Sequence, residues 1–364
     1  MKHRVAEVFA RKSYSADAVE VIDLDLTDPI SQLVLTYEVV NGATASQQGH
    51  PDLCVPKIEL VDGSDVLFSM SGKEAKALDF YHNMKVTPSL MIYPNDMNAE
   101  MIYNINFGRK LWDPLMALLP GNFRNLQLKV TIDINGGGKS ADAGYLTVLA
   151  KCFDEKAVSP IGFLMAKELK SYTLAASSWE YTDLPLDHPF RMLLLKAQAY
   201  GSGPDYQFDT VKLSEDNDKR IPFNMTIGEI LRAIMSEWPL YDEWVLDDPP
   251  TPSGGYTYIT PGYWPIALAQ EWLVPPSSNN IMGCFSGDGG RLQVGTSGGW
   301  TSNAGIHVKG WCPHNTIVLP MGDLQDPEDW FDTAALKNLK LSVKGGASLT
   351  AGTCEITAQQ FRKY

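Results

Sequence analysis

Hydrophobic and polar residues alternate over many short stretches of this 364-residue chain. In FRNLQLKVTI, residues 123–132, every second residue from Leu126 to Ile132 is apolar. Such alternation is the pattern of a half-buried strand. LKNLKLSVKG, residues 336–345, nearly repeats the segment, so the chain carries two similar strands that are far apart in the sequence.

This pair of segments belongs to a longer internal repeat. Strand alternation is common, and a single match would carry little weight. Four matches in the same order indicate a duplicated domain. The matched segments are 25–35 with 185–195, 57–78 with 210–231, 123–132 with 336–345, and 144–153 with 352–361.

The second matched pair predicts the same local structure in both copies: strand, polar turn, strand and the start of a helix. Each helix start has the form of a capping box, in which a hydroxyl and a glutamate satisfy backbone N–H groups reciprocally. The boxes predict short helices over 72–82 and 227–236. The capping residues are Ser71 with Glu74 and Thr226 with Glu229.

The first copy contains eight candidate strands separated by turn signals. Regularly spaced short strands with few helices are typical of an all-β sandwich or barrel, and eight strands fit a jelly roll. We therefore expect two tandem eight-stranded jelly-roll β-sandwiches with short helices. The candidate strands are 19–26, 30–40, 57–61, 65–70, 89–94, 99–107, 125–134 and 144–153.

The spacing of the matches locates an insertion in the second copy. Matched segments start 153 residues apart at 57 and 210 but 213 apart at 123 and 336. The predicted insertion lies within 237–335, is rich in Pro, Gly and Ser, and holds seven of the nine tryptophans. Such composition predicts irregular surface backbone, with tryptophans that pack it onto itself or onto a neighbouring subunit.

These observations divide the chain into four parts. The predicted boundaries are a basic N-terminal arm over 1–19, a first jelly roll over 20–155, a connector over 156–178, and a second jelly roll over 179–364 that carries the insertion.

Charge and cysteine content exclude several classes of protein. A net charge of −13 argues against specific nucleic-acid binding, which requires a basic face. The five cysteines are scattered, and we expect reduced, mostly buried thiols. Cys312 and His314 lie two residues apart without a second ligand pair, so we expect no metal site and no cofactor.

The remaining motifs do not form a catalytic constellation. INGGGKS, residues 134–140, has Asp133 where a phosphate-binding loop needs glycine, so a hairpin turn is the simpler interpretation. Asn224 begins a glycosylation sequon, but the repeat explains Thr226 as a helix cap. We therefore predict no catalytic residues and no enzymatic activity.

Two acidic clusters, 242–248 and 323–332, allow a different interpretation. Paired carboxylates could serve a glycosidase or bind calcium. Solvated loop charge, with Asp326 or Asp329 capping a short helix, is the simpler explanation.

The first dozen residues are basic in an acidic chain. Val5, Val8, Phe9 and Lys12 could line one face of a short helix, and a basic amphipathic end suits an anionic membrane surface. A frayed terminus is the alternative. The candidate membrane-facing residues are Lys2, Arg4, Arg11 and Lys12.

Taken together, DLTDPISQLVL, KIELVDGSDVLFSMSG, SEDNDKRIPFNMT and PEDWFDTAALKNLKLSV resemble the double jelly-roll major capsid proteins of tailless icosahedral viruses, many of which infect bacteria and enclose a membrane. The resemblance covers roughly residues 20–364. It implies a homotrimeric, pseudo-hexameric capsomer that is made in the host cytoplasm and tiles the virion shell. It also implies contacts with neighbouring capsomers, with penton and minor capsid proteins, and, through the N-terminus, with an internal viral membrane.

Two other functions remain open from the sequence alone. A glycan-binding or glycan-hydrolysing double β-sandwich would use two carboxylates and exposed tryptophans. A cell-surface adhesin is the third possibility. The size of the purified particle distinguishes these alternatives, because a capsid protein is at least trimeric whereas a hydrolase can act alone.

Overall fold

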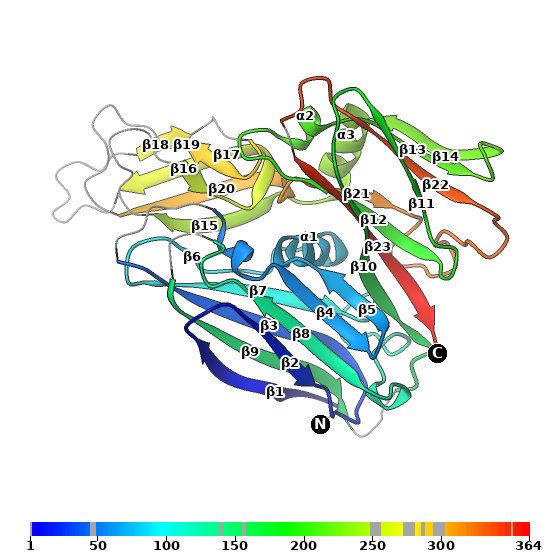
Figure 1. Cartoon of the computed structure of the whole chain (residues 1–364), viewed down its shortest axis with the longest axis horizontal. Coiled ribbons are helices and arrows are strands. Elements are labelled where there is room, and N and C mark those ends of the chain that lie inside the picture. Colours follow the sequence, from blue (N-terminus) through cyan, green and yellow to red (C-terminus); the bar gives the residue numbers. More distant parts are fainter. Residues whose placement is uncertain are drawn as a thin grey trace.

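The described residues fold into two β-sandwiches, a further five-stranded sheet and a two-stranded sheet (Figure 1). The structure is a computed structural model. It describes residues 2–43, 49–137, 141–154, 158–247, 256–271, 281–284, 288–293, 303–350 and 352–364.

The first sandwich is an eight-stranded jelly roll. Its strands are β1 (His3–Tyr14), β2 (Ala18–Asp23), β3 (Ile30–Asn41), β4 (Lys57–Asp62), β5 (Asp65–Met70), β7 (Asn98–Asn106), β8 (Leu126–Ile132) and β9 (Ala141–Phe153). One sheet has the order β1-β9-β3-β7, and the facing strands have the order β2-β8-β4-β5. This is the order in which a jelly roll pairs its strands.

The second sandwich repeats the first strand for strand. Its strands are β10 (Gly162–Thr173), β11 (Trp179–Asp183), β12 (Phe190–Ala197), β13 (Phe208–Glu215), β14 (Arg220–Thr226), β21 (Thr316–Pro320), β22 (Leu339–Gly345) and β23 (Thr353–Lys363). Their orders are β10-β23-β12-β21 and β11-β22-β13-β14. The expected fold class, two tandem jelly rolls with an insertion in the second, is therefore confirmed.

Short helices connect the strands at equivalent places. The helix α1 (Gly72–Asn83) follows β5, and α3 (Ile227–Glu237) follows β14. The other helical turns are η1 (Pro51–Cys54), η2 (Pro120–Asn122) and α2 (Pro204–Gln207). Among the described residues, none of the helices combines the length and the apolar character needed to cross a bilayer.

The two jelly rolls share one sheet. The strands β5 and β10 run parallel, with Phe68 opposite Ala166 and Ser69 opposite Lys167. This pairing creates an eight-stranded sheet of order β2-β8-β4-β5-β10-β23-β12-β21. The helix α1 lies between the rolls (Figure 1), and every residue from Gly72 to His82 is buried. The two rolls therefore form one continuous body.

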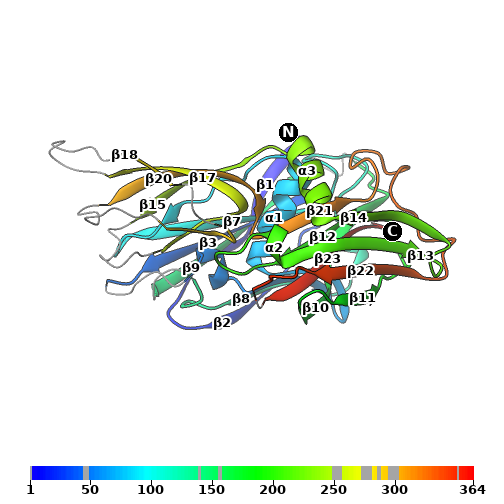
Figure 2. The same cartoon turned by 90° about the horizontal axis from the view of Figure 1, so that it is seen from above.

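The insertion adds a sheet beside the second roll (Figures 1 and 2). Its strands are β15 (Tyr241–Asp247), β16 (Tyr256–Tyr258), β17 (Pro261–Glu271), β18 (Ile281–Cys284), β19 (Arg291–Gln293) and β20 (Ala304–Pro313), joined by β6 (Met91–Ile92). The main sheet has the order β18-β17-β20-β15-β6. The expectation of irregular backbone is therefore wrong for these strands. The stretches 248–255, 272–280, 285–287 and 294–302 lie outside the described residues.

The N-terminus is a strand, and the suggested amphipathic helix is wrong. Residues His3–Tyr14 pair with β9 at the edge of the first roll, with register shifts on both sides of Phe9. These bulges interrupt strict alternation, which gives Val5, Val8 and Phe9 a spacing that resembles that of a helix. The N-terminal segment therefore belongs to the first jelly roll and is not a separate arm.

Two other boundaries also differ from expectation. The segment expected as a connector, 156–178, contains β10, so the second roll begins before residue 179. The candidate strand 89–94 contributes only β6, which pairs with β15 of the insertion. Sheet membership depends on distant partners, and alternation along the chain does not reveal it.

Candidate functional site

The basic N-terminal residues are mostly neutralised within the first roll. Arg4 pairs with Asp28 at 2.6 Å, and Lys12 pairs with Glu20 at 2.6 Å. Arg11 pairs with Glu38 at 2.9 Å and lies over the ring of Tyr145, 3.5 Å from its centroid. Lys2, the fourth basic residue, is exposed. The structure therefore places three of the four charges in ion pairs along a strand.

Both capping boxes are formed, but in different surroundings. The Ser71 hydroxyl accepts from the backbone N–H of Glu74 at 3.3 Å, and Glu74 accepts from the Ser71 N–H at 2.9 Å. Thr226 and Glu229 repeat this arrangement at 3.4 and 2.7 Å. Glu74 also accepts from the Thr357 hydroxyl of β23 at 2.8 Å. The first cap is thus part of the junction between the rolls, whereas the second is exposed.

A buried polar network continues this junction. Burial opposes ionisation of Glu74, but the Lys196 ammonium and the bonds from Ser71 hold its pKa below the usual value. Arg191 of β12 is fully buried and donates to Gln359 at 2.6 Å, and its Nη1 lies 2.9 Å from His82 Nδ1 of α1. Burial lowers the pKa of Arg191 to about 9. These contacts fix α1 against the outer face of the second roll.

A second buried cluster joins the first roll to the insertion. Asp52 of η1 accepts from Tyr103 at 2.9 Å and lies 2.8 Å from His314 Nε2 and 3.4 Å from Lys76 Nζ. His50 accepts from the Asp52 backbone N–H at 3.1 Å. All five side chains are buried.

The cluster has the residue types of a metal site but not its charge balance. Ligand atoms of His50, Asp52 and His314 lie within 4.8 Å of one another, and two histidines with a carboxylate can hold a transition metal. The Lys76 ammonium, however, already supplies positive charge to Asp52, and His50 Nδ1 is occupied by a backbone N–H. Hydrogen bonds and the Lys76 ion pair therefore account for the contacts of Asp52 and His50, whereas the buried His314 Nδ1 has no hydrogen-bond partner among the described residues.

The cluster extends to a buried carboxyl in the insertion. His50 Nε2 lies 3.1 Å from the Thr260 hydroxyl, and that hydroxyl lies 2.7 Å from Glu243. Burial raises the pKa of Glu243 to about 7 and lowers the pKa of His314 to about 4. These shifts favour neutral side chains on the insertion side, which limits the cost of burying them. The sequence did not suggest this network, because its members come from distant segments.

The acidic clusters stabilise local structure. Asp242 pairs with His307 at 2.6 Å and with Lys309 at 2.9 Å. Asp329 accepts from the backbone N–H of Asp323 at 2.7 Å. Residues 323–332 form turns, so the expected short helix capped by Asp326 or Asp329 is wrong.

The glycine-rich stretch also has a packing explanation. The strands β8 and β9 on either side of it lie in different sheets, so the expected hairpin turn is wrong. A Cβ on Gly137 would lie 2.2 Å from the backbone oxygen of His50, so close packing requires glycine there. Residues 138–140 lie outside the described part of the chain.

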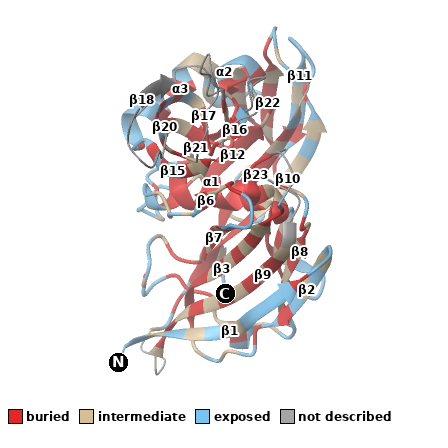
Figure 3. Ribbon diagram, turned by 90° about the vertical axis from the view of Figure 1, so that its left-hand side faces the viewer, coloured by how far each residue is buried: buried red, intermediate tan, exposed pale blue. Residues whose placement is uncertain are grey.

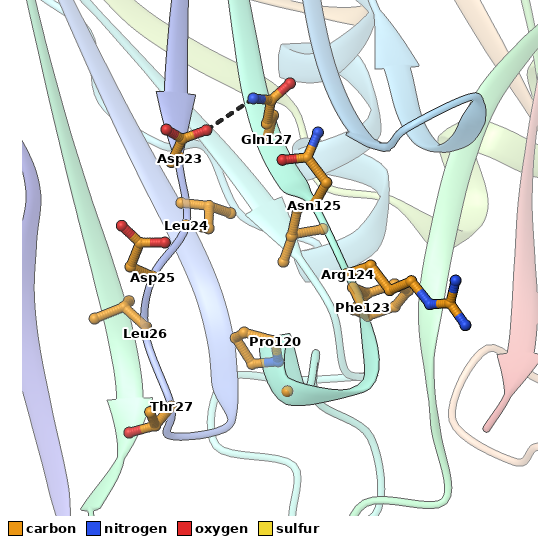
Figure 4. A pocket seen from close by; sticks show the side chains of 12 residues that line it. Asp23, Leu24, Asp25, Leu26, Thr27, Pro120, Phe123, Arg124, Asn125 and Gln127 are labelled. Carbon is orange, nitrogen blue, oxygen red and sulfur yellow. Dashed lines mark hydrogen bonds between the residues drawn. The ribbon is translucent and has the colours of Figure 1, made fainter.

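A groove of about 640 Å³ lies between the segment after β2 and the turn before β8 (Figure 4). In it, Asp23 accepts from Gln127 at 2.8 Å, and Arg124 points away from Asp25. Its lining contains neither histidine, the usual general base, nor cysteine. It therefore lacks a nucleophile–base pair of the Ser–His or Cys–His type. The lining residues are Asp23, Leu24, Asp25, Leu26, Thr27, Pro120, Gly121, Phe123, Arg124, Asn125, Leu126 and Gln127.

Comparisons with known proteins find similar structures. No protein-family model and no curated protein matches the sequence. The major capsid protein P2 from bacteriophage PM2 has a similar structure, with a TM-score of 0.56 at 9% identity over 100% of this chain and 98% of that chain. A chain in the atomic structure of Sulfolobus turreted icosahedral virus has a TM-score of 0.59 at 9% identity, over 99% of this chain and 91% of that chain.

A chain of the PBCV-1 virus capsid has a TM-score of 0.56 at 10% identity, over 99% of this chain and 93% of that chain. At these identities the similarity establishes the fold. The chain therefore shares, along nearly its whole length, the fold of chains from viral capsids, among them the major capsid protein of bacteriophage PM2.

Proposed function

We propose that the chain is the major capsid protein of a tailless icosahedral virus and is located in the virion shell. The observation that carries this proposal is the full-length fold match to capsid chains of PM2 and PBCV-1 and to a chain of Sulfolobus turreted icosahedral virus. Synthesis in the host cytoplasm follows from such a role. The buried polar networks at the junction have a structural use here, because they connect the two rolls through α1.

The capsomer of this proposal is a homotrimer. Each chain offers two similar jelly rolls, so three chains around a threefold axis present six similar blocks with a nearly hexagonal outline. Trp244 and Trp264 of the insertion expose 66% and 59% of their surfaces, and aromatic residues of this kind are enriched in protein interfaces. Partners would be neighbouring capsomers together with penton and minor capsid proteins.

Contact with an internal viral membrane is a separate part of the proposal. It is supported by the exposed Lys2 and by the basic composition of β1. Because Arg4, Arg11 and Lys12 are paired with carboxylates, we expect weak binding to anionic vesicles. Lys2→Glu should reduce co-sedimentation with such vesicles, and an unchanged bound fraction would contradict this role.

A structural role requires no catalysis, and we propose that the chain is not an enzyme, binds no cofactor, and does not bind nucleic acid specifically. Nothing in the comparisons favours the glycan-binding or glycan-hydrolysing alternative. Light scattering of the purified chain during gel filtration tests the proposal. We expect three times the mass of one chain, whereas a stable monomer would contradict it.

A further inference from the structure

The contact between the two jelly rolls within one chain indicates how two chains meet. Inside the chain, the edge strand β5 of the first roll pairs in parallel with β10 of the second, and α1 packs beside this pair. In the repeat, β14 is equivalent to β5, and β1 is equivalent to β10. Each lies at the edge of its sheet with one neighbour, β13 or β9.

The equivalence between β1 and β10 can be set residue by residue. β1 pairs with β9 with a register shift between Glu7 and Phe9, and β10 pairs with β23 with a shift between Glu168 and Lys170. The same bulge in the same strand aligns Glu7 with Glu168. Val5 and Ala6 therefore correspond to Ala166 and Lys167, the residues that pair with β5.

The capping boxes align the other two strands. Ser71 directly follows β5, Thr226 is the last residue of β14, and each caps the next helix. Aligning these caps matches Phe68 of β5 with Phe223 of β14, and Ser69 with Asn224. The parallel pairing of β5 with β10 therefore predicts an equivalent pairing of β14 with β1. In that pairing Phe223 lies opposite Val5 and Asn224 lies opposite Ala6.

Both surfaces of this predicted contact, α3 with β14 and the edge strand β1, are less buried than their equivalents inside the chain. Every residue of α1 from Gly72 to His82 is buried, whereas only Ile230, Leu231 and Ile234 of α3 are buried. Apolar side chains are exposed on α3 and along both edge strands: Val5 of β1 is 60% exposed, Ile221 of β14 45% and Met235 of α3 38%. Figure 3 shows β1 as a largely exposed strand. Exposed edge strands with apolar residues commonly pair with another chain.

The sheet face that receives α1 shows the same asymmetry. All of β12 is buried, including Lys196 on the face that contacts α1. On β3, the equivalent strand of the first roll, Val34, Thr36 and Glu38 on the outer face are only half-buried. The outer face of β3 in the first roll is thus less buried than the face of β12 that α1 covers in the second roll.

We propose that β14 and α3 of one copy dock on β1 and the outer face of β3 and β9 of a second copy, repeating the contact between β5, α1 and the second roll. The occupant is another copy of this chain, and the inference rests on the proposed trimer. Figure 1 places β1 and β14 at opposite ends of the molecule. Each copy therefore donates one surface and accepts one, and three such head-to-tail contacts close a ring.

Engineered cysteines test the register. Neighbouring strands lie about 4.8 Å apart, within the Cα–Cα range of a disulfide, about 4.4–6.8 Å. Val5→Cys combined with Phe223→Cys should give covalent dimers and trimers on oxidation. The matched control combines Val19→Cys with Phe223→Cys, because Val19 on β2 is 61% exposed against 60% for Val5. All variants carry Cys284→Ser, since the other four cysteines are buried.

The outcomes separate this inference from the proposed function. Covalent trimer from the Val5 pair but not from the Val19 pair supports the contact. If Val5→Cys with Phe223→Cys does not assemble, Ala6→Cys with Asn224→Cys replaces it. Trimers by light scattering without a cross-link in either pair overturn the contact but leave the capsomer intact. A monomeric wild-type chain overturns both.

Discussion

The buried cluster around Asp52 offers a sharp test of how the rolls and the insertion are held together. Asp52→Asn keeps the size of the side chain and removes its charge. The carboxylate interacts with Tyr103, His314 and Lys76 at 2.9, 2.8 and 3.4 Å, and all four side chains are buried. The substitution therefore leaves the Lys76 ammonium buried without its carboxylate.

The expected cost follows from this geometry. Breaking a buried ion pair by removing one partner costs about 3–5 kcal/mol. Lys76 keeps its hydrogen bond to Ser89 Oγ at 2.5 Å, so we expect the lower end, about 3 kcal/mol. Burial opposes ionisation of Asp52, but Lys76 and the histidines hold its pKa well below the usual value. The carboxylate therefore stabilises the fold above its unfolded pKa, and the difference from the variant should shrink as the pH falls below about 4.

Urea unfolding followed by tryptophan fluorescence measures the effect at pH 7 and pH 3. The control is Asp25→Asn, because Asp25 is exposed, and surface changes of this kind stay within about 0.5 kcal/mol. If Asp52→Asn is as stable as Asp25→Asn at pH 7, the cluster does not hold the structure together as described.

Four further substitutions test other parts of the structure by the same assay. Thr226→Ala should cost about 1 kcal/mol as a lost cap, and Ser71→Ala about 2 kcal/mol, because Ser71 also accepts from Lys196 in the buried junction; equal losses would contradict this difference. Trp238→Phe should cost about 1–3 kcal/mol, because the indole N–H donates to the buried backbone oxygen of Tyr81 at 3.1 Å; no loss would refute that role. Burial raises the pKa of Glu243 from 4.5 to about 7, so the folded protein keeps a proton that the unfolded chain loses, and wild-type stability falls as pH rises through this window. Glu243→Gln should remove that fall, so the stability of the variant relative to wild type should be about 3 kcal/mol higher at pH 8 than at pH 4. Parallel pH profiles of the two proteins would contradict it.

The internal repeat made the double jelly roll predictable from sequence. Two capping boxes at equivalent places and four matched strand segments recur in the same order, and the structure pairs the strands in two equivalent sandwiches. Local patterns were sufficient here because a cap and a strand depend on neighbouring residues. The duplication therefore followed from the residues themselves, whereas the jelly roll rested on a count of eight strands that included 89–94 in place of β1.

Long-range contacts explain what the sequence did not show. The bulges beside Phe9 give β1 the spacing of a helix, and the partners of its basic residues, such as Asp28 and Glu38, lie far along the chain. Asp52 and His314 are separated by 262 residues, and no local motif announces their contact. The pairing of β6 with β15 likewise depends on the fold bringing two rolls together.

Cryo-electron microscopy of the purified full-length chain tests the central claim most directly. A chain built from two equivalent jelly rolls should appear as a trimer in which six similar sandwiches surround a threefold axis, with a nearly hexagonal outline. A monomer, or an assembly in which the two rolls do not alternate around one axis, would contradict the proposed capsomer.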